Sequence, residues 1–157
     1  MKTFYLVVFV SLLLSGCSKH IDTKKQHVVE LNMEAVDAAG REVQMEESGL
    51  VYQICENALL SKDDIIDIDL VQVDMGCCLL LYLSVQGRAS LERSIANHLD
   101  RSIVLMIDGM PVGARKFKPE GLEDQGLFIF TEWGDDRLED FVVGAKESFR
   151  TAAKVGS

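Results

Sequence analysis

Histidine is scarce in this chain, and its scarcity narrows the catalytic chemistry that the sequence supports. The 157 residues contain 3 histidines, and two of them, His20 and His27, fall in a polar segment near the amino terminus. His98 falls near the end of a predicted helix, where the helix dipole favours a cationic imidazole. Nucleophilic catalysis needs a hydroxyl or thiol beside an oriented base. We therefore predict that His98 caps a helix, and we predict no enzyme activity and no cofactor.

Basic residues are also few, which argues against partners that are bound through positive charge. The chain has 16 Lys and Arg against 25 Asp and Glu, a net charge of −9. Nucleic acids are bound when Lys and Arg neutralise phosphates, and anionic lipid surfaces attract basic segments in the same way. The sequence therefore predicts no nucleic-acid partner and no attachment of the folded domain to anionic lipid.

The chain has one long apolar run, which lies at the amino terminus. Residues 4–14 (FYLVVFVSLLL) follow the positive charge of Lys2 and precede Ser15, Gly16 and Cys17. This run of eleven residues is too short to span a hydrocarbon core about 30 Å thick. A basic start, an apolar run and small residues are instead typical of a secretory signal peptide.

Residues 14–17 (LSGC) resemble the lipobox of bacterial lipoproteins. The resemblance implies that diacylglycerol is attached to the sulfur of Cys17 and that cleavage makes this cysteine the first residue of the mature chain. The alternatives are an ordinary signal peptide and an uncleaved anchor. Ser18 resembles outer-membrane sorting signals rather than the aspartate of inner-membrane retention, so we predict a lipid anchor facing the periplasm, with the outer membrane favoured. The predicted organisation is a signal peptide over 1–16, a lipidated cysteine and polar tether over 17–27, and one domain over 28–153.

Three further cysteines, Cys55, Cys77 and Cys78, lie within the predicted domain. The periplasm permits disulfides, so one interpretation pairs Cys55 with Cys77 or Cys78. The other treats all three as small buried hydrophobic residues. Neighbouring residues of a strand point to opposite faces, so we expect only one of Cys77 and Cys78 to face the core. A CC pair without histidine or further cysteine spacing does not predict a metal site.

Alternating and helical patterns predict an α+β fold, with two helices on one face of a mainly antiparallel, ferredoxin-like sheet. Ser84 is the predicted N-cap of the first helix, whose buried stripe consists of Leu91, Ile95 and Leu99. Asp135 or Asp136 is the predicted cap at the start of the last helix. An apolar stripe marks that last helix: Leu138, Phe141, Val142, Ala145, Phe149 and Ala152. We predict strands over 28–36, 49–55, 66–70, 77–83, 101–107, 112–118 and 126–131, helices over 85–98 and from 135 or 136 to about 153, and turns over 37–41 and 108–111.

From about Leu50 to Ser148 this pattern resembles the periplasmic head subdomain of the SecD/SecDF protein-export family. The matched segments are residues 60–65 (LSKDDI), 79–83 (LLLYL) and 100–109 (DRSIVLMIDG), followed by the strand at 126–130. Asp100 stands where the family usually has glycine, and Met110-Pro111-Val112 matches the family's next segment only in part. The resemblance implies the fold and a capacity to touch polypeptide. It does not imply proton-driven export, because the family's membrane helices have no counterpart here.

A cluster of acidic residues and Trp133 are further candidates for a metal site and a partner-binding site. Asp63, Asp64, Asp67, Asp69 and Asp74 lack the glycine and terminal glutamate of an EF-hand loop, so we predict no calcium site. Trp133 either anchors a partner or covers the open end of the core. The sequence thus predicts a non-enzymatic lipoprotein that binds an envelope protein or unfolded polypeptide. The alternative is a sensor for a small ligand or cell-wall fragment.

Overall fold

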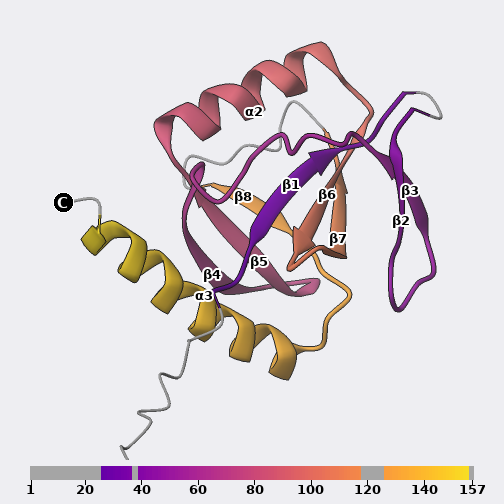
Figure 1. Cartoon of the computed structure of the whole chain (residues 1–157). Helices are drawn as coiled ribbons and strands as arrows, with labels where there is room; N and C mark the ends of the chain where they lie inside the picture. Colours follow the sequence, from indigo (N-terminus) through magenta and orange to yellow (C-terminus); the bar gives the residue numbers. More distant parts are fainter. Residues whose placement is uncertain (1–25, 37–38, 118–125, 156–157) are drawn as a thin grey trace, which may run out of the picture.

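The computed structural model describes residues 26–36, 39–117 and 126–155, and within them it confirms the predicted α+β class (Figure 1). Two helices lie in this part of the chain, α2 (Val85–Asn97) and α3 (Asp135–Val155). The strands are β1 (Val29–Met33), β2 (Arg41–Gln44), β3 (Val51–Ile54), β4 (Ile65–Val73), β5 (Gly76–Leu83), β6 (Ser102–Ile107), β7 (Met110–Lys116) and β8 (Leu127–Ile129). Neither described helix is long and apolar enough to cross a membrane.

All pairs among the described strands are antiparallel, and these strands form two three-stranded sheets and a hairpin. The first sheet has the order β1-β6-β7, the second has the order β4-β5-β8, and β2 pairs with β3. Among the described residues, one bridge joins the two sheets, between Gly113 of β7 and Thr131, two residues beyond the end of β8. A Cβ atom added to Gly113 would lie 2.3 Å from the carbonyl oxygen of Phe130. Glycine therefore permits the close approach of the two sheets.

The main core lies between the two sheets and the two helices. In Figure 1, α2 crosses one end of the sheets, while α3 runs beside β4 at the opposite end. Leu91 and Ile95 of α2 are buried there, as predicted. The predicted stripe of α3 also reaches the core: Leu138, Phe141, Val142 and Ala145 are buried and Phe149 packs against them, while the side chain of Ala152 lies outside the described residues.

A second, smaller core lies on the other side of β6. Val104 and Met106 of β6 pack there against Val43 of β2 and Ile54 of β3. All six residues of β6 are buried, because the strand is central in its sheet and covered on both faces. The β2–β3 hairpin thus serves as the outer cover of the first sheet, and Figure 1 shows it standing to one side of the two larger sheets.

Both predicted caps of the first helix are confirmed. The hydroxyl of Ser84 accepts a hydrogen bond from the Gly87 amide at 3.0 Å. At the other end His98 is the C-cap residue, and its ring Nδ1 lies 3.1 Å from the Ser94 carbonyl oxygen. Leu99, in contrast, was predicted to be buried but is 53% exposed. The prediction was wrong because α2 ends at Asn97 and the chain reverses at Asp100, which has a φ of 70°.

The start of β7 and the presence of β2 also differ from the prediction. Residues 110 and 111 were assigned to a turn, but Met110 and Pro111 begin β7, and the turn consists of Asp108 and Gly109. Pro111 is tolerated because the register of β6 and β7 shifts at this point, and proline is accepted at such irregularities. Strand β2 was not predicted.

His27 also lies elsewhere than predicted. It was assigned to the polar tether, but its Nδ1 lies 2.9 Å from the Asp108 carboxylate and its ring packs edge-on against Phe141. Asp108 also accepts a hydrogen bond from the Val28 amide at 3.0 Å. The folded part of the chain therefore includes His27.

Candidate functional site

A groove of about 430 Å³ lies on the outer face of the strands, on the side away from the main core. It forms where β7 and β8 separate beyond the Gly113–Thr131 bridge, since no further pairing joins these strands within the described residues. The residues that line it come from β4, β5, β7, β8 and the position just after β8: Val73, Cys78, Ala114, Arg115, Lys116, Phe128 and Phe130.

Strand alternation explains why two aromatic side chains reach this groove. Leu127 and Ile129 of β8 are buried in the main core. Phe128, and Phe130 just beyond the strand, therefore point to the opposite face. Phe130 is 40% exposed, so part of an aromatic ring is available to a ligand.

Arg115 spans the gap between the two strands. Its guanidinium donates a hydrogen bond to the carbonyl oxygen of Phe128 at 2.8 Å, and the bond is partly buried. The side chain thus replaces a backbone bond where β7 and β8 no longer pair. Lys116 follows it at the exposed end of β7.

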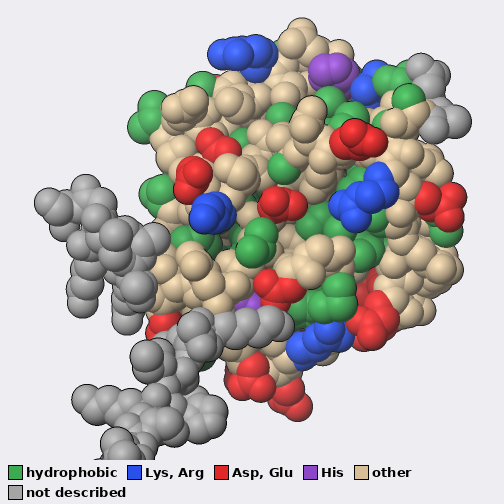
Figure 2. Space-filling model, in the orientation of Figure 1, with side chains coloured by type: hydrophobic (Ala, Val, Ile, Leu, Met, Phe, Trp, Pro, Cys, Tyr) green, Lys and Arg blue, Asp and Glu red, His purple; other side chains and the backbone are tan. Residues whose placement is uncertain are grey.

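The groove differs in charge from the rest of the protein. Its described lining contains two cationic side chains, Arg115 and Lys116, and no carboxylate, whereas the chain as a whole has a net charge of −9. On the face seen in Figure 2, acidic side chains are spread over the surface with Lys and Arg between them. The described lining of the groove is therefore more positive than the chain as a whole.

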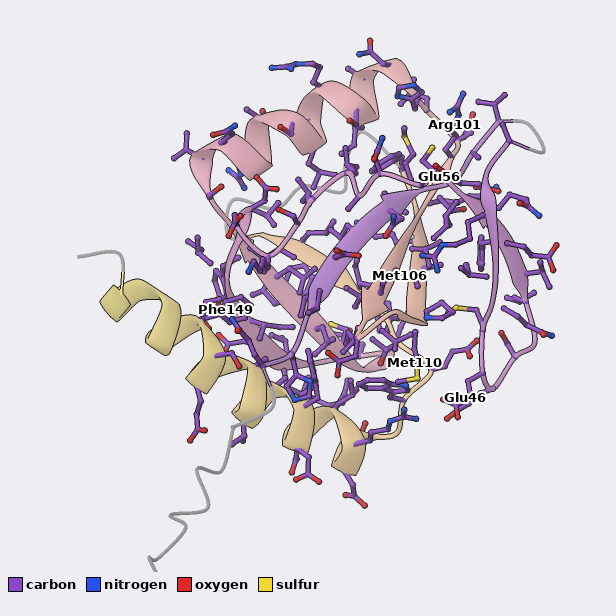
Figure 3. All side chains as sticks on the ribbon, viewed as in Figure 1. Glu46, Glu56, Arg101, Met106, Met110 and Phe149 are labelled. Atoms are coloured by element: carbon purple, nitrogen blue, oxygen red, sulfur yellow. The ribbon has the colours of Figure 1, made fainter. Side chains whose placement is uncertain are left out.

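A second depression, of about 470 Å³, lies between the β2–β3 turn and the start of β7. Figure 3 shows Glu46 and Met110 at this end of the molecule. The Glu132 carboxylate accepts hydrogen bonds from the amides of Glu47 and Ser48 at 2.9 and 3.2 Å. Burial opposes ionisation of Glu132, but hydrogen bonds from the Ser48 side chain and from these two amides prevail and lower its pKa. This carboxylate holds the hairpin in place.

Asp69 is another carboxylate with defined partners. It is bonded to Lys146 of α3 and accepts a hydrogen bond from the Tyr82 hydroxyl at 3.0 Å. The bond to Lys146 is the main cause that lowers the pKa of Asp69, and the bond to Asp69 raises the pKa of Tyr82. These contacts tie α3 to β4 and β5. The described residues contain no group of His, Cys, Asp and Glu side chains arranged to hold a metal ion.

Trp133 lies in the main core. It is 8% exposed, its ring packs edge-on against Phe141 at 5.8 Å, and the Arg137 guanidinium covers it 4.0 Å from the ring centroid. Of the two predicted roles, covering the core is the one that this placement fits, and the partner-binding role stays a prediction. Cys17, the predicted lipidation site, lies outside the described residues.

No disulfide joins Cys55, Cys77 and Cys78 in the part of the chain that the structure describes. Cys77 packs against the main core, while the buried side chain of Cys78 lines the groove on the opposite face, as strand alternation predicts. The Cys77 thiol donates to Gln72 Oε1 at 2.9 Å. Burial, followed by the carboxylates of Asp135 and Glu139, raises the pKa of Cys77, so this thiol remains protonated at neutral pH.

Apart from Cys78, which was predicted only as a possible disulfide partner, the groove residues were not among the predicted site residues. The alternation of Ala114 and Lys116 on one strand and of Phe128 and Phe130 on another carried the only signal in the sequence. That signal indicates an outward face, but the meeting of the two strands depends on the Gly113–Thr131 bridge.

The chain matches no protein-family model, no curated protein and no solved structure. The resemblance to the SecD/SecDF head subdomain therefore stays a prediction.

Proposed function

We propose that this chain is a lipoprotein, anchored through Cys17 on the periplasmic side of the envelope, whose domain binds a polypeptide in the groove between β7 and β8. The observation that carries the proposal is the combination in one groove of two aromatic rings, Phe128 and Phe130, with the fixed guanidinium of Arg115. Aromatic residues and arginine are the side chains enriched at protein–protein interfaces.

The strand edges beside the groove also suit a polypeptide. Beyond Gly113, β7 has β6 as its only strand partner among the described residues, and β8 pairs only with β5 there. Strand edges present backbone donors and acceptors that an extended chain can use. A groove bordered by such edges offers both side-chain and backbone contacts.

The proposed anchor would keep this groove close to the membrane. His27 and Val28 fix the start of the domain to Asp108, so the linker from Cys17 consists of residues 18–26. An extended chain spans at most about 3.3–3.6 Å per residue, which gives this linker a reach of about 30 Å. Envelope proteins at the membrane surface lie within that reach.

A sensor for a small ligand or cell-wall fragment is the second candidate. The groove volume of about 430 Å³ falls in the range of about 300–1,000 Å³ that is usual for small-ligand sites. Exposed Phe130 favours the polypeptide, because small-ligand sites bury most of the ligand surface.

Site-specific photocrosslinking of the full-length protein in its native envelope separates the two candidates. A photoreactive phenylalanine replaces Phe130, and the control variant carries it at Val143, which is 64% exposed on α3. We expect an adduct with a polypeptide from position 130 and none from position 143. A small mass increment at position 130 would support the sensor instead, and equal labelling at both positions would contradict a specific groove.

A further inference from the structure

We propose that the polypeptide segment bound in the groove is anionic and apolar, with a carboxylate held at Arg115 and Lys116 and a neighbouring apolar side chain against Phe128 and Phe130. This inference rests on the proposed function and specifies the chemistry of its ligand.

Arg115 is positioned in advance to receive a carboxylate. A guanidinium carries five N–H donors in a rigid fork, and the bond from Nη1 to the Phe128 carbonyl holds that fork partly buried at the groove. A side chain that is already fixed loses less conformational freedom when it binds. The planar fork also matches a carboxylate better than a single ammonium does.

Lys116 adds a second positive charge, with no acid among the described residues of the lining. It is exposed at the end of β7, and no Asp or Glu is among the described residues that line the groove. A cationic ligand would therefore meet two like charges here, and a neutral ligand would bring no counter-ion for either of them. Complementary charge of this kind sets specificity between partners.

The apolar half of the ligand follows from the other lining residues. Val73, Ala114, Phe128 and Phe130 supply apolar surface next to the two cations. Successive side chains of an extended segment lie about 3.3 Å apart along its axis. Neighbouring side chains point to opposite faces, whereas side chains two residues apart share a face. A segment with an acidic residue two positions from an apolar residue can therefore reach both halves of the groove at once.

Fluorescence anisotropy with defined peptides on the full-length protein in detergent micelles tests this inference. The probe is an acetylated and amidated peptide with Glu-Ser-Phe at its centre and Gly-Ser flanks, so that Glu and Phe share a face, and its partners carry Gln-Ser-Phe or Lys-Ser-Phe. We expect the Glu peptide to bind about tenfold more tightly than the Gln peptide, the equivalent of about 1.4 kcal/mol, and the Lys peptide to bind least.

Charge reversal provides the decisive comparison. Lys116→Glu is expected to weaken the Glu peptide about tenfold and to strengthen the Lys peptide, while Arg93→Glu, at an exposed position of α2 outside the groove, changes neither. Phe130→Ser is expected to weaken all three peptides, and circular dichroism establishes that each variant is folded.

Equal binding of the Glu and Gln peptides, or a Lys116→Glu variant that keeps the wild-type preference, would overturn the inference. A polypeptide adduct at position 130 would in that case still support the proposed function. If no peptide binds and position 130 gives no polypeptide adduct, both proposals fail.

Discussion

The Trp133 side chain is covered by Phe141 and Arg137, and the residue is only 8% exposed to solvent. Truncating a buried tryptophan to alanine removes its packing and leaves a cavity, at a cost of about 3–5 kcal/mol. We therefore expect Trp133→Ala to lower the free energy of unfolding by about that amount, measured by chemical denaturation followed by circular dichroism. Leu50→Ala is the control, because Leu50 is 55% exposed. A variant that unfolds like the wild type would indicate that Trp133 serves a partner instead.

Glu132 makes the attachment of the hairpin depend on pH. Because its pKa is lowered in the folded state from the ordinary value of 4.5, ionised Glu132 contributes stability above that value. This contribution is lost as the pH falls through the lowered folded pKa. We expect Glu132→Ala to speed hydrogen exchange at the Glu47 and Ser48 amides several-fold at neutral pH, with the difference from wild type disappearing in acid.

The control for this experiment is Glu139→Ala on α3, which is exposed and should leave the two amides unchanged. Equal exchange at Glu47 in the wild type and in Glu132→Ala would show that the carboxylate does not hold the turn.

Single residues could be predicted from sequence where their partners are near in the chain. Ser84 bonds to an amide three residues away and His98 to a carbonyl three residues back, so local patterns sufficed. His27 could not be assigned, because its partner Asp108 lies 81 residues further along. A polar residue beside a tether gives no sign of such a contact.

The same contrast between near and distant partners explains why α2 could be predicted from the sequence and β2 could not. The start of α2 follows from its cap and its apolar spacing. Strand β2 (REVQ) offers only Val43 as an apolar residue, and that residue becomes buried only because the hairpin packs on Val104 and Met106 of β6. A strand that depends on a distant surface leaves little pattern in its own sequence.

The junction of β7 and β8 depends on one glycine. Gly113→Ala would place a Cβ atom 2.3 Å from the Phe130 carbonyl oxygen, which forces the two strands apart. Overpacking of this kind costs about 1–3 kcal/mol, so we expect a lower melting temperature and weaker binding in the groove. Gly134→Ala is the matched control, since no atom lies within 4 Å of its added Cβ. Equal melting of the two variants would show that the strands can separate freely.

For the molecule as a whole, the fold class was predictable and the groove was not. Periodicity gives the number and kind of elements, but the groove arises from which strands meet and where their pairing stops. Val73, Cys78 and Phe128 come from three strands of one sheet, while Arg115 comes from the other. Only the assembled sheets bring them together.

The proposed location of the whole molecule at the membrane depends on the thiol of Cys17. Stable attachment needs more than one acyl chain, because a single chain gives marginal membrane binding at about 0.8 kcal/mol per buried CH₂. In the native host we expect the mature wild-type chain to begin at residue 17, to carry acyl groups in its intact mass and to incorporate labelled palmitate. Cys17→Ser should lose the label entirely, whereas Cys55→Ser, at a half-buried position of the domain, should keep it. An unacylated wild-type amino terminus would remove the anchor from the proposal and leave the groove to be tested on its own.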